Sequence, residues 1–208
     1  MNEDKTFFDR LLEIIAVLLL AVTTLGTAWC GYQASQWAGV QTDDNRAESQ
    51  HLLEANRAYG TALQTFTYDS NVIALYAQAV QAGNTALAKF YRDTMVRKEF
   101  LPILDQWEAT VRAGGTPTPL LEDPAYRQVE GAAFQDAQAQ AQAAAQQAQE
   151  AGDNAQQYVL NTIVLAVALF FAGVTSSFRY KPARTMLIIL ALGTLAFAAS
   201  RVADLPIA

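Results

Sequence analysis

The amino-acid sequence predicts an all-α membrane protein with three transmembrane helices and a long extramembrane helical hairpin, or coiled-coil stalk, between the first two. Three observations lead to this fold class. Three apolar runs each come close to the roughly 20 residues that a helix needs to cross a bilayer. Only 16% of the residues are charged, against about 25% in a typical soluble domain. The chain between the first two runs has strong helical signals.

The three apolar runs define the predicted spans. They cover residues 11–30, 158–178 and 185–202. Buried helices of a soluble protein are the alternative, but three such runs in 208 residues favour a membrane. The first run ends in LGTAWC, which is similar to a lipoprotein cleavage site before Cys30. Trp29 stands where that site needs a small residue, and the run exceeds a signal core of roughly 7–15 residues. We therefore interpret it as a retained span.

Lysine and arginine near the spans predict their direction. The inner ends of the spans carry five basic residues: Lys5, Arg10, Arg179, Lys181 and Arg184. Because cytoplasmic segments are enriched in these residues, we expect segment 1–10 and loop 179–184 in the cytoplasm. Residues 31–157 and 203–208 are then extracytoplasmic.

Residues 31–157 have the periodicity of helices. No proline occurs between Gln41 and Ala82. Apolar residues recur there at steps of three and four, with one step of seven, which is the heptad pattern of a coiled coil. These residues are Leu52, Ala55, Tyr59, Ala62, Phe66, Ile73, Tyr76 and Val80. The pattern continues from the first span, so a single long helix could result. The sequence TYDSN at 67–71 could interrupt it, because Asp and Ser are cap-forming types.

Turn residues divide the rest of the stalk. Gly83 is a typical helix stop, and we expect a second helix over 85–112, with Pro102 marking a kink or a restart. After a loop rich in glycine and proline, Asp123 as N-cap and Pro124 as first helical residue predict a third helix. That helix enters the second span through a stretch of almost pure Ala and Gln. A disordered Gln-rich segment is the alternative for this stretch.

The C-terminal end of the first span and the residues that follow it would form a helix with two distinct faces. Small residues at every fourth position would form one ridge on a helix, which allows another helix to approach closely. This small-residue ridge consists of Thr23, Thr27, Gly31, Ser35 and Gly39. Aromatic residues at other positions are expected at the membrane–water interface. They are Trp29, Tyr32 and Trp37. The ridge is either a packing face within the chain or an interface between subunits.

The composition argues against several kinds of site. With one cysteine, Cys30, and one histidine, His51, no internal disulfide is possible and a metal centre within the chain is disfavoured. Glu48 and His51 have the Glu-x-x-His spacing of di-iron bundles, but one histidine cannot complete that site. Motifs for nucleophilic catalysis or phosphate binding are missing from the sequence. We therefore expect no catalytic residue, metal or cofactor. The net charge of −6 argues against binding of nucleic acid.

Glu13 is the only acidic residue within a predicted span. An ionisable group inside a membrane is a functional hypothesis by default, here the passage of a proton or cation. The alternative is that its carboxylate reaches the cytoplasmic surface, because it lies near the start of the span.

Much of the chain resembles a group of uncharacterised bacterial integral membrane proteins. The resemblance rests on AGNTALAKFYRDTMVRKEFLPILDQWEA, PTPLLEDPAYRQ and YVLNTIVLAVALFFAGV. It also rests on a W-x-x-Y-Q-A-x-x-W element formed by Trp29, Tyr32, Gln33, Ala34 and Trp37. The layout is similar to that of the DUF4337-type membrane proteins as well. The resemblance implies bacterial origin, and with it the inner membrane, and three spans; it implies no known activity.

Two functions from different classes fit this sequence. The first is a non-catalytic, homo-oligomeric scaffold or assembly module, because three spans cannot pair all their small residues within one chain. A pore along its axis is a sub-hypothesis, with Thr23, Thr27 and Ser177 as candidate lining residues. The second is an extracytoplasmic sensor or binding module that works through a partner protein. Its pocket would be lined by Phe90, Tyr91, Phe100 and Trp107. The expected partners are the lipid bilayer, other copies of the chain and another membrane protein.

Overall fold

The computed structural model describes residues 7–116, 118–178 and 180–208. The described chain is helical, with turns and short loops and no strand. Lys5 and Arg179, on which the predicted direction partly depends, lie outside the described residues.

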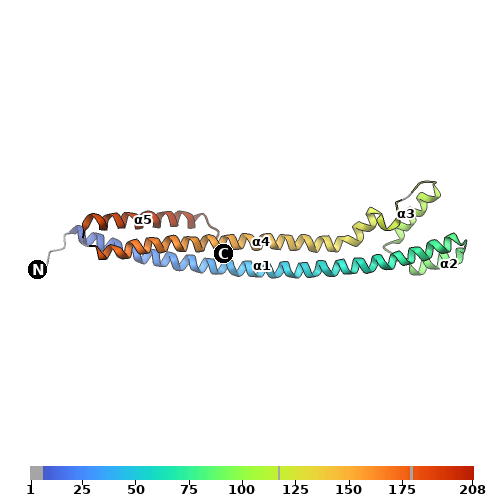
Figure 1. Cartoon of the computed structure of the whole chain (residues 1–208), viewed down its shortest axis with the longest axis horizontal. Coiled ribbons are helices and arrows are strands. Elements are labelled where there is room, and N and C mark those ends of the chain that lie inside the picture. Colours follow the sequence, from blue (N-terminus) through green and yellow to red (C-terminus); the bar gives the residue numbers. More distant parts are fainter. Residues whose placement is uncertain (1–6, 117, 179) are drawn as a thin grey trace. The chain divides into compact units, whose positions relative to one another are not determined.

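Three helices are long. Helix α1 covers Phe7–Gln81, α4 covers Pro124–Val174 and α5 covers Lys181–Ala203 (Figure 1). By length and composition, each of them could cross a membrane. This confirms the expected all-α class with three long apolar helices. Helix α1 is continuous over 75 residues, including 67–71, so no break separates the first predicted span from the residues that follow it.

Shorter elements connect α1 to α4. They are α2 (Thr85–Phe90), the π-helix η1 (Tyr91–Met95), α3 (Leu101–Arg112) and the 3-10 helix η2 (Leu120–Glu122). A further 3-10 helix, η3 (Thr175–Ser177), follows α4. The single helix expected over 85–112 is thus divided. Helix α3 begins anew with Pro102 in its first turn, where the missing N–H of proline costs nothing.

Local signals set the helix ends much as the sequence predicts. Gly83 has a φ of +69°, which glycine adopts without steric cost, and it ends α1. The Asn84 side chain accepts a hydrogen bond of 3.0 Å from a backbone N–H in the first turn of α2. The Asp123 carboxylate accepts one of 2.8 Å from the N–H of Ala125 as α4 begins at Pro124. The Ala/Gln stretch is part of α4 and not a disordered segment.

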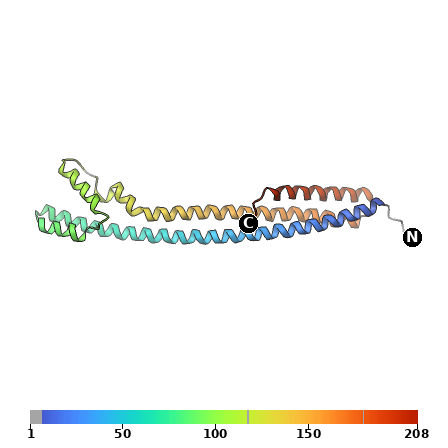
Figure 2. The ribbon, with the colours of Figure 1, turned by 180° about the vertical axis from the view of Figure 1, so that it is seen from behind.

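The chain forms two compact units. The first consists of the described residues up to Arg46 together with Ala144–Ala208, and the second is Ala47–Ala143. In the first unit, α5 lies beside the C-terminal part of α4 in both views (Figures 1 and 2). Two clusters of buried apolar residues lie in this unit: Leu12, Leu19, Ala172, Ile188 and Ala191 form one, and Cys30, Tyr158, Leu165 and Ala198 form the other.

The last residues of the chain are held within the first unit. The Pro206 carbonyl accepts hydrogen bonds of 3.1 Å from the Trp37 indole and from the Tyr158 hydroxyl. The Ala208 N–H donates to the buried side chain of Gln33 at 3.0 Å. The C-terminal segment is therefore attached to both α1 and α4.

The second unit has its own apolar core, formed by Val72, Val96, Phe100, Ile103, Leu104, Leu120 and Tyr126. Within it, the buried residues of α1 are Ala55, Asp69, Val72 and Ala79. The predicted heptad pattern matches this face only in part, because Leu52, Tyr59, Phe66 and Val80 are 45–54% exposed. The apolar pattern omitted Asp69, a charged residue that lies on the buried face.

Candidate functional site

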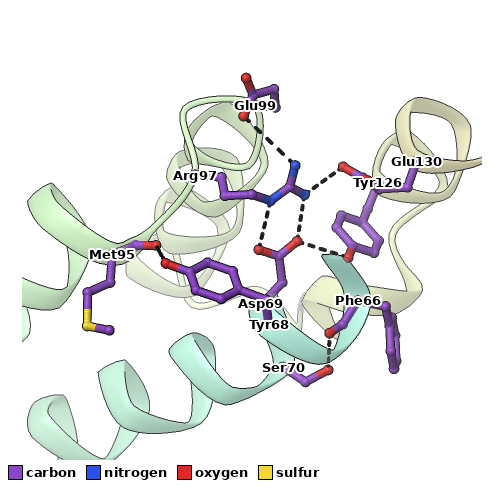
Figure 3. Close-up of polar contacts among 9 residues, drawn as sticks. All are labelled: Phe66, Tyr68, Asp69, Ser70, Met95, Arg97, Glu99, Tyr126 and Glu130. Carbon is purple, nitrogen blue, oxygen red and sulfur yellow. Dashed lines mark hydrogen bonds and ion pairs between the residues drawn. The ribbon is translucent and has the colours of Figure 1, made fainter. Parts of the chain in front are cut away.

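A buried carboxylate lies in the second unit, in the course of α1. Asp69 is only 2% exposed. Arg97 donates to it twice, from Nε to Oδ1 at 3.0 Å and from Nη2 to Oδ2 at 2.6 Å (Figure 3). The Tyr126 hydroxyl donates to Oδ2 at 3.0 Å. This paired arrangement suits the planar guanidinium group and supplies the partners that a buried charge requires.

Arg97 extends these contacts to further acidic residues. Its Nη2 donates to Glu130 Oε1 at 2.6 Å, and its Nη1 lies 3.9 Å from Glu99 Oε2. The hydrogen bond to Asp69 raises the pKa of the Arg97 guanidinium, although burial opposes the rise. Burial and then the hydrogen bond to Asp69 raise the pKa of the Tyr126 hydroxyl. At neutral pH Arg97 is thus charged and Tyr126 is neutral. We call Asp69, Arg97, Tyr126 and Glu130 the Asp69 network.

Three segments of the second unit supply this network: α1, the residues between η1 and α3, and the start of α4. Val96 has an extended backbone, with ψ 128°, which ends η1 and leads directly to Arg97. The Tyr68 hydroxyl donates to the Met95 carbonyl at 2.8 Å, so α1 also holds the chain just before Arg97 (Figure 3). Short π-helices are frequent at functional sites. Here one precedes the arginine that joins the three segments.

An apolar hollow of about 860 Å³ lies next to the network. This volume falls within the roughly 300–1,000 Å³ typical of sites for small molecules. The aromatic residues that line it are Tyr59, Phe66, Trp107, Tyr126 and Phe134, and the aliphatic ones include Leu63 and Leu120. We call it the Trp107 hollow. Tyr126 and Glu130 belong to both the hollow and the Asp69 network, so the network fixes one wall of the hollow.

The hollow has few charged lining residues, and only some of them form ion pairs. Its charged lining residues are Glu122, Arg127 and Glu130. Glu130 is already paired with Arg97 at 2.6 Å. Within the described part of the chain, no ion pair involves Glu122 or Arg127. The hollow therefore combines an apolar wall with two charged groups that are available to a ligand.

A second polar cluster joins α1 to α3 in the same unit. The Tyr76 hydroxyl donates to Glu108 Oε1 at 2.6 Å, and Arg92 and Arg112 each donate to Glu108 Oε2 at 3.2 Å. Burial, followed by the hydrogen bond to Glu108, raises the pKa of Tyr76 to about 12. These contacts hold the helix that carries Trp107 against α1.

Only part of the small-residue ridge is buried within the first unit. Thr23 is fully buried, and its hydroxyl donates to backbone carbonyls of the preceding turn. Thr27 is half-buried, whereas Gly31, Ser35 and Gly39 are exposed. A Cβ added at Gly31 or Gly39 would meet no atom within 4 Å. The described part of the chain therefore packs nothing closely against Gly31 or Gly39.

The other predicted residues are distributed along α1. Trp29 and Tyr32 are 45% and 55% exposed, with ring centroids 6.1 Å apart, and Glu13 is exposed on α1. Nδ1 of His51 lies 3.2 Å from Glu54, the residue one turn after it. Among the described residues, no group of three or more His, Cys, Asp or Glu side chains is placed to hold a metal ion.

The sequence pattern drew attention to Trp107 but not to the Asp69 network. Of the residues named for the predicted pocket, Trp107 lines the hollow, whereas Phe100 is buried in the core and Phe90 is 52% exposed. One signal was available: Asp69 lies midway between Ala62 and Tyr76 at steps of seven. Comparison of the chain with protein-family models, with curated proteins and with solved structures gave no match.

Proposed function

We propose that the chain is a non-catalytic membrane protein whose second unit binds a small, largely apolar molecule in the Trp107 hollow. The observation that carries the proposal is the convergence of aromatic rings around one open volume of about 860 Å³. Tyr59 and Phe66 remain 53% and 45% exposed there. Concentrated apolar surface of this kind marks a site of interaction. A partner protein would then respond to the binding of this molecule.

The test follows Trp107 fluorescence in the full chain, held in lipid nanodiscs. Trp29→Phe and Trp37→Phe leave Trp107 as the one tryptophan of the three. Hexanol is expected to change the emission saturably, since it would bury apolar surface beside the indole.

Glycine substitutions supply the matched controls. Gly131 lines the hollow, and a Cβ there meets only the Gln135 side chain, at 3.6 Å. Gly131→Leu is therefore expected to fold, fill the hollow and abolish the response. Gly60→Leu, where a Cβ meets nothing within 4 Å and which lies outside the hollow, is expected to retain it. An unsaturable response, equal in all three proteins, would contradict the proposal.

A homo-oligomeric scaffold is the second candidate, and a separate observation favours it. Gly31 and Gly39 lower the stability of α1 by roughly 1 kcal/mol each relative to alanine. Among the described residues, none lies within 4 Å of a Cβ built on either glycine. A helix of another copy could pack closely against Gly31, Ser35 and Gly39, because their small side chains let two backbones approach each other. A pore would need other lining residues than Thr23, because Thr23 is fully buried inside the chain.

The mass of the protein in nanodiscs tests this candidate. We expect a single closed oligomer for the native chain and a lower mass for Gly31→Leu, because the leucine would separate the helices. Gly193→Leu is the matched control on α5, where a Cβ also meets nothing within 4 Å. A monomeric native protein would rule out both the scaffold and the pore.

A further inference from the structure

We propose that the ligand of the Trp107 hollow is an amphiphile with a cationic head, an amine or a quaternary ammonium group, and an alkyl or aryl body. This inference rests on the binding function proposed above and adds the chemistry of the ligand. It follows from the shape of the hollow, from the charges along it and from its aromatic lining.

The apolar body has a wall to bind against. The Tyr59 and Phe134 rings, from α1 and α4, lie with their centroids 5.8 Å apart, and Trp107 of α3 lines the same volume. The backbone of Gly131 adds room in the α4 wall, because no side chain projects from it. An alkyl chain placed here would shield the exposed parts of Tyr59 and Phe66 from water.

The charges at the hollow favour a cation. Two carboxylates, Glu122 and Glu130, line it, against the single guanidinium of Arg127. Arg97 does not change this balance, because its charge is matched by that of the buried Asp69. The lining therefore has an excess of one negative charge. Glu122 and Arg127 both lack an ion-pair partner among the described residues, so either head would find a counter-charge at the hollow. The second carboxylate, Glu130, gives the advantage to a cationic head that pairs with Glu122.

The aromatic lining adds to this preference. A cation over the face of a Trp, Tyr or Phe ring is attracted by the negative charge of that face, and five aromatic residues line the hollow. A second copy of the chain is a poorer occupant, because each copy carries a net charge of −6 and like charges repel. The observations thus favour a small cationic amphiphile.

The experiment compares three probes with the same six-carbon chain: hexyltrimethylammonium, hexanol and hexanesulfonate. Binding to the full chain in nanodiscs is followed by Trp107 fluorescence, with Trp29 and Trp37 replaced by Phe. We expect the cation to bind at least tenfold more tightly than hexanol and the sulfonate most weakly. Added salt should weaken the binding of the cation, because its charge contacts are partly exposed.

Variants that remove one charge identify the residue responsible for the preference for the cationic probe. Glu122 is exposed and outside the core, so Glu122→Gln is expected to fold and to lose most of the preference for the cation over hexanol. Asp136→Asn removes one negative charge from α4 outside the hollow and is expected to keep that preference.

Each contrary outcome contradicts a different statement. If hexanol binds saturably and the cation binds no more tightly, the binding function stands and the cationic head is wrong. If no probe saturates, both proposals fail. If Glu122→Gln and Asp136→Asn behave alike, the charge assignment is wrong. If Gly131→Leu changes the mass of the protein in nanodiscs, the hollow is an interface between copies, and the ligand proposal is overturned.

Discussion

Asp69 illustrates how one buried charge constrains the residues around it. Removing an ionised carboxylate from water costs several kcal/mol, which only well-placed partners offset. Arg97 and Tyr126 supply them from segments 28 and 57 residues along the chain. Because the cost is highest when one partner is removed and the other stays, the stability of the second unit depends on the pair more than on either residue.

Arg97→Ala is expected to lower the free energy of unfolding of residues 47–143 by about 3–5 kcal/mol. Asp69 would remain buried with a single hydrogen bond, from Tyr126. Hydrogen exchange of backbone amides in this unit measures the loss. Arg57→Ala serves as the control, because Arg57 is exposed on α1 within the same unit and a charge at such a position contributes about 1 kcal/mol at most. An equal effect of the two substitutions would show that the Asp69 network is not needed for stability.

At the scale of the element, the alanine-rich half of α4 buries only small side chains. The buried residues there are Ala137, Ala141, Ala144, Ala148 and Ala151, at steps of four and three. Alanine adds little apolar area, but it lets a neighbouring backbone come close. In the first unit the approach is close enough that a Cβ on Gly152 would lie 2.5 Å from the Gln41 amide nitrogen.

Ala148→Leu is expected to destabilise the first unit by about 1–3 kcal/mol, because three extra carbons must enter a closely packed face. Ala148 is 3% exposed. Ala143→Leu, the same change at an exposed position of α4, should have little effect. Thermal unfolding followed by circular dichroism compares the two. Equal stability would mean that the alanine face of α4 tolerates larger side chains.

The sequence predicted those parts of the elements that depend on local signals. Gly83 and Pro124 end and begin helices where expected, since their effects act within one turn. The heptad spacing is consistent with a buried Asp69, but its pairing could not be predicted, because its partner Arg97 is 28 residues away and only the fold of the chain after η1 brings them together. The sequence offered Trp107 as a pocket residue, but the other walls of the Trp107 hollow, from α1, η2 and α4, could not be predicted, because they lie far from Trp107 along the chain.

At the scale of the whole molecule, three long apolar helices leave the direction of insertion to the charges at their ends. Arg10 lies at the start of α1, and Lys181 and Arg184 lie at the start of α5. Basic residues at these ends favour the cytoplasm for both. We propose on this basis that the second unit lies on the extracytoplasmic side of the membrane.

Labelling of Gln138→Cys with a membrane-impermeant maleimide tests this direction. Gln138 is exposed on α4, and the native Cys30 is 1% exposed, so the native chain reports the background. Labelling is expected when the reagent is added from the extracytoplasmic side of intact spheroplasts. Labelling only after the membrane is opened would reverse the topology.

The spacing of the buried residues also bears on how this protein can change in evolution. In α1 of the second unit, Ala55 and Asp69 are 14 residues apart, and Val72 and Ala79 are 7 apart. One inserted residue would rotate everything after it by about 100° and carry Asp69 away from Arg97. Seven inserted residues return the helix to within about 20° of its former face. We therefore expect tolerated insertions and deletions in α1 to be seven residues long. A matching change of seven residues is expected in α4.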